Sequence, residues 1–432
     1  MDRFRKEWGS ICHSSLAHNA GWMFLGQGLS VICQGAYFIL LGRLLGSTEY
    51  GIYVGAVAMV SILSQYSPLG SHSVFLRYVS PDPKYFAFYW GNILVTTVTL
   101  GSLFVALLTW AGPHLAHSYS WAMLLCIALG ECLCAQLTAA AGRVFQAFEK
   151  MRITAGLSLL VNLLRTLLAG LMLWRLHHGT AWQWAIAALI VSSIAAGTAL
   201  ALVTRLYGKP AFSMLLLRRR LGEGFVFALS YSTTGVCSDI DKAMLGHYGM
   251  NAANGIYTMA YRVIDVCTMP ILSIQGAAFP RLFRKGVDGV RSTAQYSVRI
   301  VKRTAPLALL SAAAMLLAAP IIPHLLGKGF NESVLAIRWL CLLPFFRSFQ
   351  LSAGDAVTAA GHQKLRLGSQ AAAAAFNFGI NLYLIPHYSW RGAAWSSLAT
   401  DGILAVFNWI VLFWLLSANG LQSKLIGEHV PS

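Results

Sequence analysis

The sequence predicts an all-α polytopic membrane protein with twelve transmembrane helices in two six-helix bundles. Three observations predict this class: 57% of the 432 residues are hydrophobic, only 11% are charged, and long apolar runs recur along the chain. A soluble domain usually carries about 25% charged residues, so the charges here are too few to cover a soluble protein. Inside lipid every backbone group must pair internally, and apolar runs of this length indicate helices rather than the short alternating strands of a barrel.

The twelve expected spans follow one another with short connections. Each run is close to the roughly 20 residues that a helix needs to cross the hydrocarbon layer. We expect them at about 18–41, 52–74, 87–110, 119–142, 153–174, 182–204, 224–247, 254–279, 304–326, 334–358, 367–386 and 393–416.

The Lys and Arg residues predict the orientation. In the segments between spans, 23 of them fall on one side of the membrane and 4 on the other. By the positive-inside rule, both termini are therefore expected in the cytoplasm. The Lys and Arg residues of these inner segments explain the net charge of +17, and their side chains are expected to contact anionic membrane lipids. No nucleic-acid partner is expected, because the positive charge is spread over many loops.

An internal repeat divides the chain. The stretch "LGRLLGSTEYGIY" (41–53) aligns without a gap with "LGHYGMNAANGIY" (245–257), and both follow the first span of a half. Because each half has an even number of spans, both halves enter the membrane from the same side. A pseudo-two-fold axis along the membrane normal is expected to relate bundle 1–212 to bundle 213–432.

Charged residues inside the spans are the candidate site. At membrane depth each costs about 2.5–3.5 kcal/mol on insertion scales, so such residues usually face a partner or a watery cavity. Glu131, Arg165 and Arg347 are expected roughly 18–20 Å from the membrane surface, near the midplane. An Arg-lined cavity suits an anionic solute, because guanidinium groups bind phosphate in bidentate fashion.

We assign two sets of roles to these residues. Arg165, Arg262, Arg347, Asn162 and Lys242 are expected to bind substrate. The carboxylates are expected to tune these charges or to bind a coupling ion: Glu131, Asp239, Asp241 and Asp265.

A structural interpretation stays open beside this functional one. Arg262 with Asp265, and Asp239 with Lys242, are spaced i, i+3 on one helix face and would form self-neutralising pairs. Glu131 would then serve only to neutralise Arg165.

The sequence predicts no enzymatic activity and no metal site. It contains neither a Walker A pattern nor a His-Glu-x-x-His motif, and no outer segment is long enough to carry a catalytic domain. No catalytic residue is therefore assigned. The eight cysteines show no metal-ligand spacing or disulfide framework.

Two stretches carry a resemblance to a known family. The opening "NAGWMFLGQGLSVICQGAYFILLGRLLGSTEYGIYVGAVAMV" (19–60) and the later "DIDKAMLGHYGMNAANGIYTMAYRVIDVCTMPILSI" (239–274) resemble oligosaccharide flippases of the Wzx type. These belong to the multidrug/oligosaccharidyl-lipid/polysaccharide (MOP) exporter superfamily. The cationic lumen of that family is matched in kind by Arg165, Arg262 and Arg347, and its acidic residue in span 7 corresponds to Asp241.

The resemblance implies a function. Such a protein moves undecaprenyl-pyrophosphate-linked oligosaccharide across the bacterial inner membrane by alternating access, for O-antigen (lipopolysaccharide), capsule or exopolysaccharide assembly. It needs no cofactor beyond a coupling H⁺ or Na⁺, and its expected partners include a polysaccharide polymerase and other assembly proteins. A cation-coupled multidrug antiporter of the same superfamily is the alternative. Against it, such exporters usually concentrate acidic residues in the N-terminal half, whereas span 1 here has no carboxylate.

Overall fold

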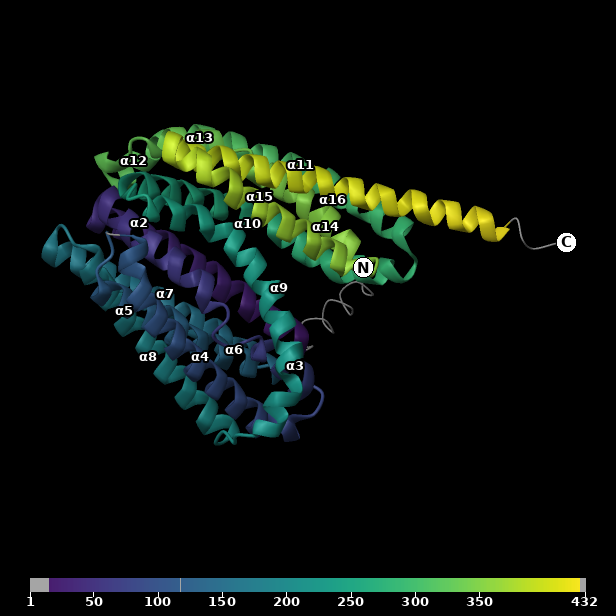
Figure 1. Ribbon diagram of the computed structural model, residues 1–432, viewed down its shortest axis with the longest axis horizontal. Coiled ribbons are helices and arrows are strands. Elements are labelled where there is room, and N and C mark those ends of the chain that lie inside the picture. Colours follow the sequence, from purple (N-terminus) through teal and green to yellow (C-terminus); the bar gives the residue numbers. More distant parts are fainter. Residues whose placement is uncertain (1–14, 117, 428–432) are drawn as a thin grey trace, which may run out of the picture. The chain divides into compact units, whose positions relative to one another are not determined.

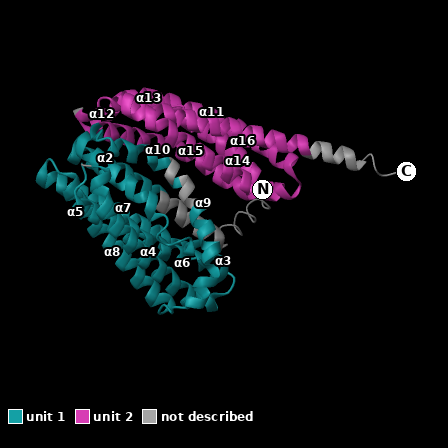
Figure 2. Cartoon of the chain, in the orientation of Figure 1, with its two compact units in different colours: residues 1–252 teal, residues 253–432 magenta. Residues whose placement is uncertain are grey.

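The computed structural model describes residues 15–116 and 118–427, and the regular structure of these residues is entirely helical. The chain forms two compact units, Met1–Ala252 and Ala253–Ser432, which Figure 2 shows in different colours. Each unit is described by itself.

The first unit contains the helices of the N-terminal half (Figure 1). In chain order they are α2 (Ser15–Ser64), α3 (Ser71–Val79), η1 (Pro83–Tyr85), α4 (Phe86–Leu115), α5 (Trp121–Ala128), η2 (Leu129–Ala135), α6 (Gln136–Ala147), α7 (Met151–Leu176), α8 (Ala181–Tyr207) and α9 (Met214–His247). Their aromatic core packs around Trp90 of α4, Phe75 of α3 and Phe145 of α6, all of which are fully buried.

The second unit begins two residues into α10. Its elements are α10 (Asn251–Val287), α11 (Val290–Ala318), η3 (Ala319–Ile321), α12 (Ile322–Leu326), η4 (Lys328–Phe330), α13 (Ser333–Leu340), α14 (Leu343–Ala359), α15 (Gln363–Tyr388) and α16 (Trp390–Gly427). Leu282, Val357 and Leu412 are buried at the contact of α10, α14 and α16.

Every expected span overlaps helix in the structure, although turns at 65–70 and 341–342 interrupt the expected spans 52–74 and 334–358. Nine helices of the described part are long and apolar enough to cross a membrane, and the first of them, Gly28–Ser64, covers parts of two expected spans. The two expected spans outside this group lie in α9, which carries Asp239, Asp241 and Lys242, and in α15, which buries Asn377 and Asn381. The chain is therefore a multi-pass membrane protein, as the sequence predicts.

A glycine with a left-handed backbone turns the chain at the same place in both halves of the repeat. Gly46 breaks α2 at φ 67° and ψ 179°, which separates its two membrane-crossing segments. Gly249, at φ 70°, lies in the turn between α9 and α10. Only glycine adopts such angles without steric cost, and the alignment of the repeat places the two glycines one position apart. The repeated motif therefore encodes a turn between two spans.

The division between the two units follows the packing of α9. This helix packs against α2, α3 and α4, so the compact units divide after Ala252 rather than after residue 212. The predicted boundary at residue 212 was based on helix count, not contacts, and it stays a prediction.

One face of α7 is exposed along its length. Leu163, Leu167, Leu171 and Trp174 recur at spacings of three or four residues and are 43–70% exposed. In a membrane protein such a stripe contacts lipid, because hydrocarbon rather than water surrounds it. The other face of α7, which carries Asn162 and Arg165, is therefore directed into the bundle.

The close packing of α3 against α9 can be tested by substituting Gly70. This residue caps the N-terminus of α3 at φ 68°, and a Cβ there would overlap the backbone carbonyl of Gly224 in α9. We expect Gly70→Ala to lower the free energy of unfolding by about 2–4 kcal/mol, through left-handed strain and overpacking. Thermal unfolding of the purified protein in detergent measures this as a lower Tm. Gly156→Ala is the control, because no atom lies within 4 Å of the Cβ it adds. An equal Tm for both variants would contradict the packing.

Candidate functional site

The ionisable side chains of the spans form three groups, and each group lies within one unit. The first surrounds Arg165 on α7, the second lies on α9, and the third joins α10, α14 and α16. A charge inside a bilayer requires a counter-charge, hydrogen bonds or water, so the partners of each group decide what it can do.

Arg165 lies on the inner face of α7, which polar contacts fix against α2. One turn before it, Asn162 donates a hydrogen bond from Nδ2 to the hydroxyl of Ser30. Beside it, Thr166 donates from Oγ1 to the carbonyl of Cys33 at 2.9 Å. These bonds orient α7, and with it the Arg165 side chain, towards the interior of the first unit.

The guanidinium of Arg165 has no carboxylate in ion-pair contact. Tyr37, Tyr53 and Glu131 lie near enough to interact with it electrostatically. Among the described residues, however, no carboxylate oxygen comes within 4.0 Å of it, and its buried Nε has no hydrogen-bond partner. Glu131 therefore attracts Arg165 without a direct ion pair, and the alternative in which it only neutralises Arg165 stays open. This arginine keeps hydrogen-bonding capacity for another group.

Glu131 projects from a distorted helix. It lies in η2, a seven-residue π-helical segment that joins α5 to α6. Such segments are uncommon and frequently occur at functional sites, because the wider winding changes the direction of the side chains. Sequence reasoning, which assumed a regular α-helix here, gave the approximate depth of Glu131 but not its direction.

A polar cavity of about 450 Å³ lies inside the first unit, against α6, α7 and α8. Arg143 and Arg165 are the charged residues that line it, and the polar residues around them are Thr138, Gln146, Thr154, Ser158, Asn162 and Ser192. This volume falls within the range of small-ligand sites, roughly 300–1,000 Å³.

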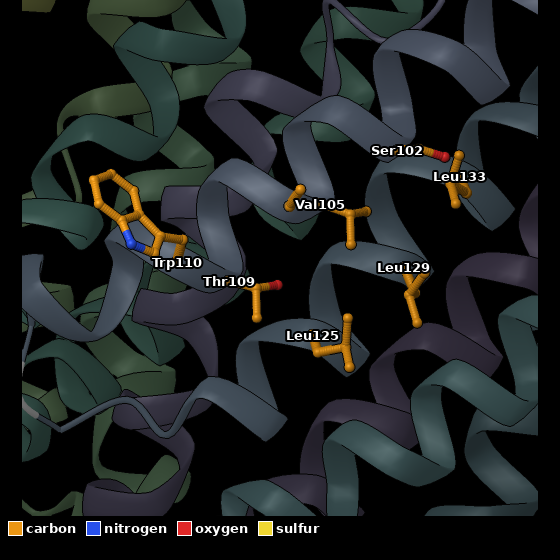
Figure 3. Close-up of a pocket in the computed structure, with 8 residues that line it drawn as sticks. Ser102, Val105, Thr109, Trp110, Leu125, Leu129 and Leu133 are labelled. Atoms are coloured by element: carbon orange, nitrogen blue, oxygen red, sulfur yellow. The ribbon is translucent and has the colours of Figure 1, made fainter.

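A second cavity in the same unit has a different character. It measures about 410 Å³ and lies between α4 and the α5–η2 segment. Figure 3 shows Val105, Thr109 and Trp110 on one wall, and Leu125 and Leu129 on the other. Trp110 is 72% exposed, so this cavity lies at the lipid-facing surface. Hydrocarbon suits such a lining, and the cavity containing Arg165 is the candidate for a polar ligand.

The second group, on α9, contains one ion pair. Lys242 Nζ lies 3.0 Å from Asp239 Oδ1, and Ser61 of α2 donates a hydrogen bond to Asp239 Oδ2 at 2.6 Å. The backbone N–H of Lys242 donates to the carboxylate of the buried Asp241. The predicted i, i+3 pair between Asp239 and Lys242 therefore exists, and the buried Asp241 adds a second negative charge beside it.

The third group is a network in the second unit. Arg347 of α14 donates from Nη1 to Asp265 of α10 at 3.1 Å, and its Nε lies 3.5 Å from Asp401 Oδ2 on α16. Arg262 completes the network at 3.9 Å from Asp265. The ring of Tyr261 lies 5.6 Å from the Arg347 guanidinium, a distance typical of a cation–π contact.

Exposure differs within this network. The Arg347 and Asp401 side chains are 22% and 20% exposed, whereas that of Asp265 is 42% exposed. The two arginines balance the two carboxylates, so the network has little net charge. It suits a site where a cation or proton exchanges with an existing ion pair.

The structure therefore brings the predicted residues together in three places. Asp401 was missed as a partner of Arg347, although it is the one charged residue in the expected span 393–416. Arg143 was missed because it was counted among the loop charges. Near the end of α14, Asp355 pairs with Arg366 at 2.7 Å, which gives it a structural role.

Comparison with known proteins agrees with this architecture. The model of a family described as "Polysaccharide biosynthesis protein" matches residues 16–285. No curated protein sequence matches the chain significantly.

Solved structures show the fold. An inward-facing multidrug resistance MATE family transporter of the MOP superfamily superposes with a TM-score of 0.71 at 15% identity, covering 92% of this chain and 98% of that one. The MATE multidrug transporter DinF-BH gives 0.66 at 17% identity, with coverage of 92% and 95%. A MOP superfamily transporter from Pyrococcus furiosus, whose title reports reverse polarity of the binding pocket, gives 0.63 at 15% identity, with coverage of 94% and 96%. The predicted fold class and the resemblance to this superfamily are thus confirmed.

The Arg347–Asp401 contact makes a prediction about stability. Asp401→Asn leaves Arg347 with Asp265 alone, and Arg347→Gln removes this ion pair from Asp401, so we expect each to lower the free energy of unfolding by about 1–3 kcal/mol. The double variant should lose less than the sum, because it leaves no charge unpaired. Thermal unfolding in detergent supplies the three values.

The exposed pair Lys285–Asp288 is the control for this cycle. Its side chains are more than half exposed, so Lys285→Gln should change stability by less than about 1 kcal/mol. Strictly additive losses at Arg347 and Asp401 would show that the two residues do not interact.

Proposed function

Because the chain belongs to the polysaccharide biosynthesis protein family and has the fold of MOP-superfamily transporters, we propose that it is a lipid-linked oligosaccharide flippase. Its substrate is an undecaprenyl-pyrophosphate-linked oligosaccharide, which it moves from the inner to the outer leaflet of the bacterial inner membrane by alternating access. The product serves the assembly of O-antigen, capsule or exopolysaccharide.

The guanidinium of Arg165, which has no carboxylate within 4.0 Å among the described residues and a buried Nε without a hydrogen-bond partner, is the observation that carries this proposal. An arginine near mid-depth without an ion pair attracts an anion, and a guanidinium matches the geometry of phosphate oxygens. A pyrophosphate-linked lipid presents such an anion, whereas a cationic drug would be repelled. Arg262, 38% exposed, adds a second accessible positive group in the other unit.

The carboxylates supply the coupling step of this proposal. Asp265 is the most exposed member of the second-unit network and binds H⁺ or Na⁺, which weakens its ion pair with Arg347. Arg347 then exchanges its carboxylate partner for the substrate. Glu131, Asp239 and Asp241 tune the charge in the first unit, where Lys242 remains paired with Asp239.

A multidrug antiporter is the second candidate, and the solved relatives with multidrug titles favour it. In such a protein the carboxylates bind the cationic drug and the arginines are secondary. The two functions therefore differ in which sign of charge is essential.

The orientation and partners follow from the flippase function. The Lys and Arg bias favours cytoplasmic termini in a bacterial inner membrane. A polysaccharide polymerase on the outer side consumes the flipped substrate, and the inner basic segments contact anionic lipid.

Arg165 provides the test of this function. In a strain that lacks its own flippase, Arg165→Ala should reduce surface glycan about ten- to a hundredfold, the effect of losing a charge-assisted hydrogen bond. Arg165→Lys should retain part of the activity, because it keeps the charge but loses the bidentate geometry. Surface glycan is measured by immunoblot and normalised to the amount of the protein in the membrane.

Arg175→Ala is the matched control on the same helix. Arg175 is exposed, lies beyond the cavity and stacks over Trp174 at 5.0 Å, so its removal should leave glycan unchanged. Full glycan in Arg165→Ala, together with resistance to cationic dyes that depends on Asp265, would reject the flippase in favour of the antiporter.

A further inference from the structure

The polar cavity of the first unit extends along α7 from Thr154 to Arg165. These residues are eleven positions apart, which is about 16 Å along a helix. At the Thr154 end, α6 contributes Arg143 and Gln146, close to the turn that joins α6 to α7. The cavity is therefore an elongated crevice with one arginine near each end.

The mouth of this crevice lies at the end of the bundle that the Lys and Arg distribution assigns to the cytoplasm. Arg143 is half-buried there, and its Nη1 donates to Gln146 Oε1 at 3.0 Å. This bond occupies one of the five N–H groups of the guanidinium. The remaining donors are available to a ligand that enters from this side.

Small residues on η2 and α6 keep the crevice open. Ala135, Ala139 and Gly142 form part of the wall opposite the α7 side chains. At Gly142 the helices approach closely, and Thr154 donates from Oγ1 to its carbonyl at 3.5 Å. Beyond this contact, Ser158 and Asn162 add hydrogen-bonding groups between the two arginines.

Both charged residues of the crevice lining, Arg143 and Arg165, are positive, and Glu131 lies outside the lining, near enough to Arg165 to attract it. No carboxylate belongs to the crevice lining in the part of the chain that the structure describes. At the inner end, the Nε of Arg165 is buried and has no hydrogen-bond partner. A buried guanidinium donor that lacks a partner indicates a missing acceptor, because buried polar groups are nearly always satisfied.

We propose that this crevice is a phosphate-binding site, in which Arg143 receives a phosphate group at the mouth and Arg165 holds it at the inner end. Ser158 and Asn162 supply hydrogen bonds along the way. A volume of about 450 Å³ admits a phosphate or pyrophosphate group but not a whole oligosaccharide, which stays outside. The identification of this group as the headgroup of the transported lipid rests on the proposed function, whereas anion binding itself does not.

Binding to the purified full-length protein tests the site. The protein is placed in phosphatidylcholine nanodiscs, and the Kd of farnesyl pyrophosphate and of inorganic pyrophosphate is measured by microscale thermophoresis. We expect Arg143→Gln and Arg165→Gln each to weaken binding at least tenfold, since each removes a charge-assisted contact. Arg175→Gln, outside the crevice, should bind as the unaltered protein does.

The two ligands distinguish the source of the phosphate. Binding of both with the same dependence on Arg143 and Arg165 supports a site for any phosphate group. Binding of farnesyl pyrophosphate alone, with that dependence, supports a site for a lipid headgroup. Binding that is equal in Arg143→Gln, Arg165→Gln and Arg175→Gln overturns the proposal, as does the absence of binding by either ligand.

Two further measurements keep these outcomes interpretable. Arg143→Lys preserves the charge and should lose less than Arg143→Gln, which separates ligand binding from misfolding when size-exclusion profiles are compared. Surface glycan is measured for the same variants. Arginine-dependent binding without any glycan transport would support the crevice as a phosphate site and reject the flippase function. Transport that survives Arg143→Gln, with unchanged binding, would support the flippase function and reject the crevice as the phosphate site.

Discussion

The cost of placing charge in hydrocarbon governs the arrangement of this protein. Each ionisable side chain within a span needs a counter-charge, hydrogen bonds or water, since the alternative costs several kcal/mol. The α9 group meets this need locally, through Asp239, Lys242 and Ser61. The Arg347 network meets it across three helices. Arg165 has no carboxylate within 4.0 Å among the described residues, and it depends on the longer-range attraction of Glu131 and on the cavity beside it.

This difference separates the two halves of an internal repeat. Both halves build the same glycine-turned pair of spans, at Gly46 and at Gly249, so the repeat specifies the backbone. The charges are not repeated: the first unit holds an arginine without an ion pair, and the second holds a balanced network. Evenly matched charges respond to a proton or cation, whereas a guanidinium without an ion pair responds to an anion. In the proposed function, Arg165 of the first unit binds the anionic group, and the second unit supplies the coupling carboxylate Asp265 together with Arg262 and Arg347.

The sequence predicts the fold more completely than the site, for a physical reason. Span positions depend on local apolar runs, and the Asp239–Lys242 pair depends on helical spacing within four residues, so both follow from the sequence. Arg347 and Asp401 are distant in the chain, and only helix packing brings them together. The orientation of Glu131 depends on a π-helical segment that no periodicity reveals. Within the two units, these residues form three groups whose partners the sequence alone does not reveal.

The geometry of α7 explains how one helix satisfies both lipid and a polar ligand. Leu163, Leu167 and Leu171 lie on its exposed face, and Ser158, Asn162 and Arg165 line the cavity on its other face. A helix with this division is stable in the membrane only if water or a ligand fills the polar side, because an empty crevice would leave the guanidinium donors unsatisfied. Water satisfies those donors but supplies no negative charge. In the proposed site, a phosphate replaces this solvent with a charged acceptor that both Arg143 and Arg165 can bind.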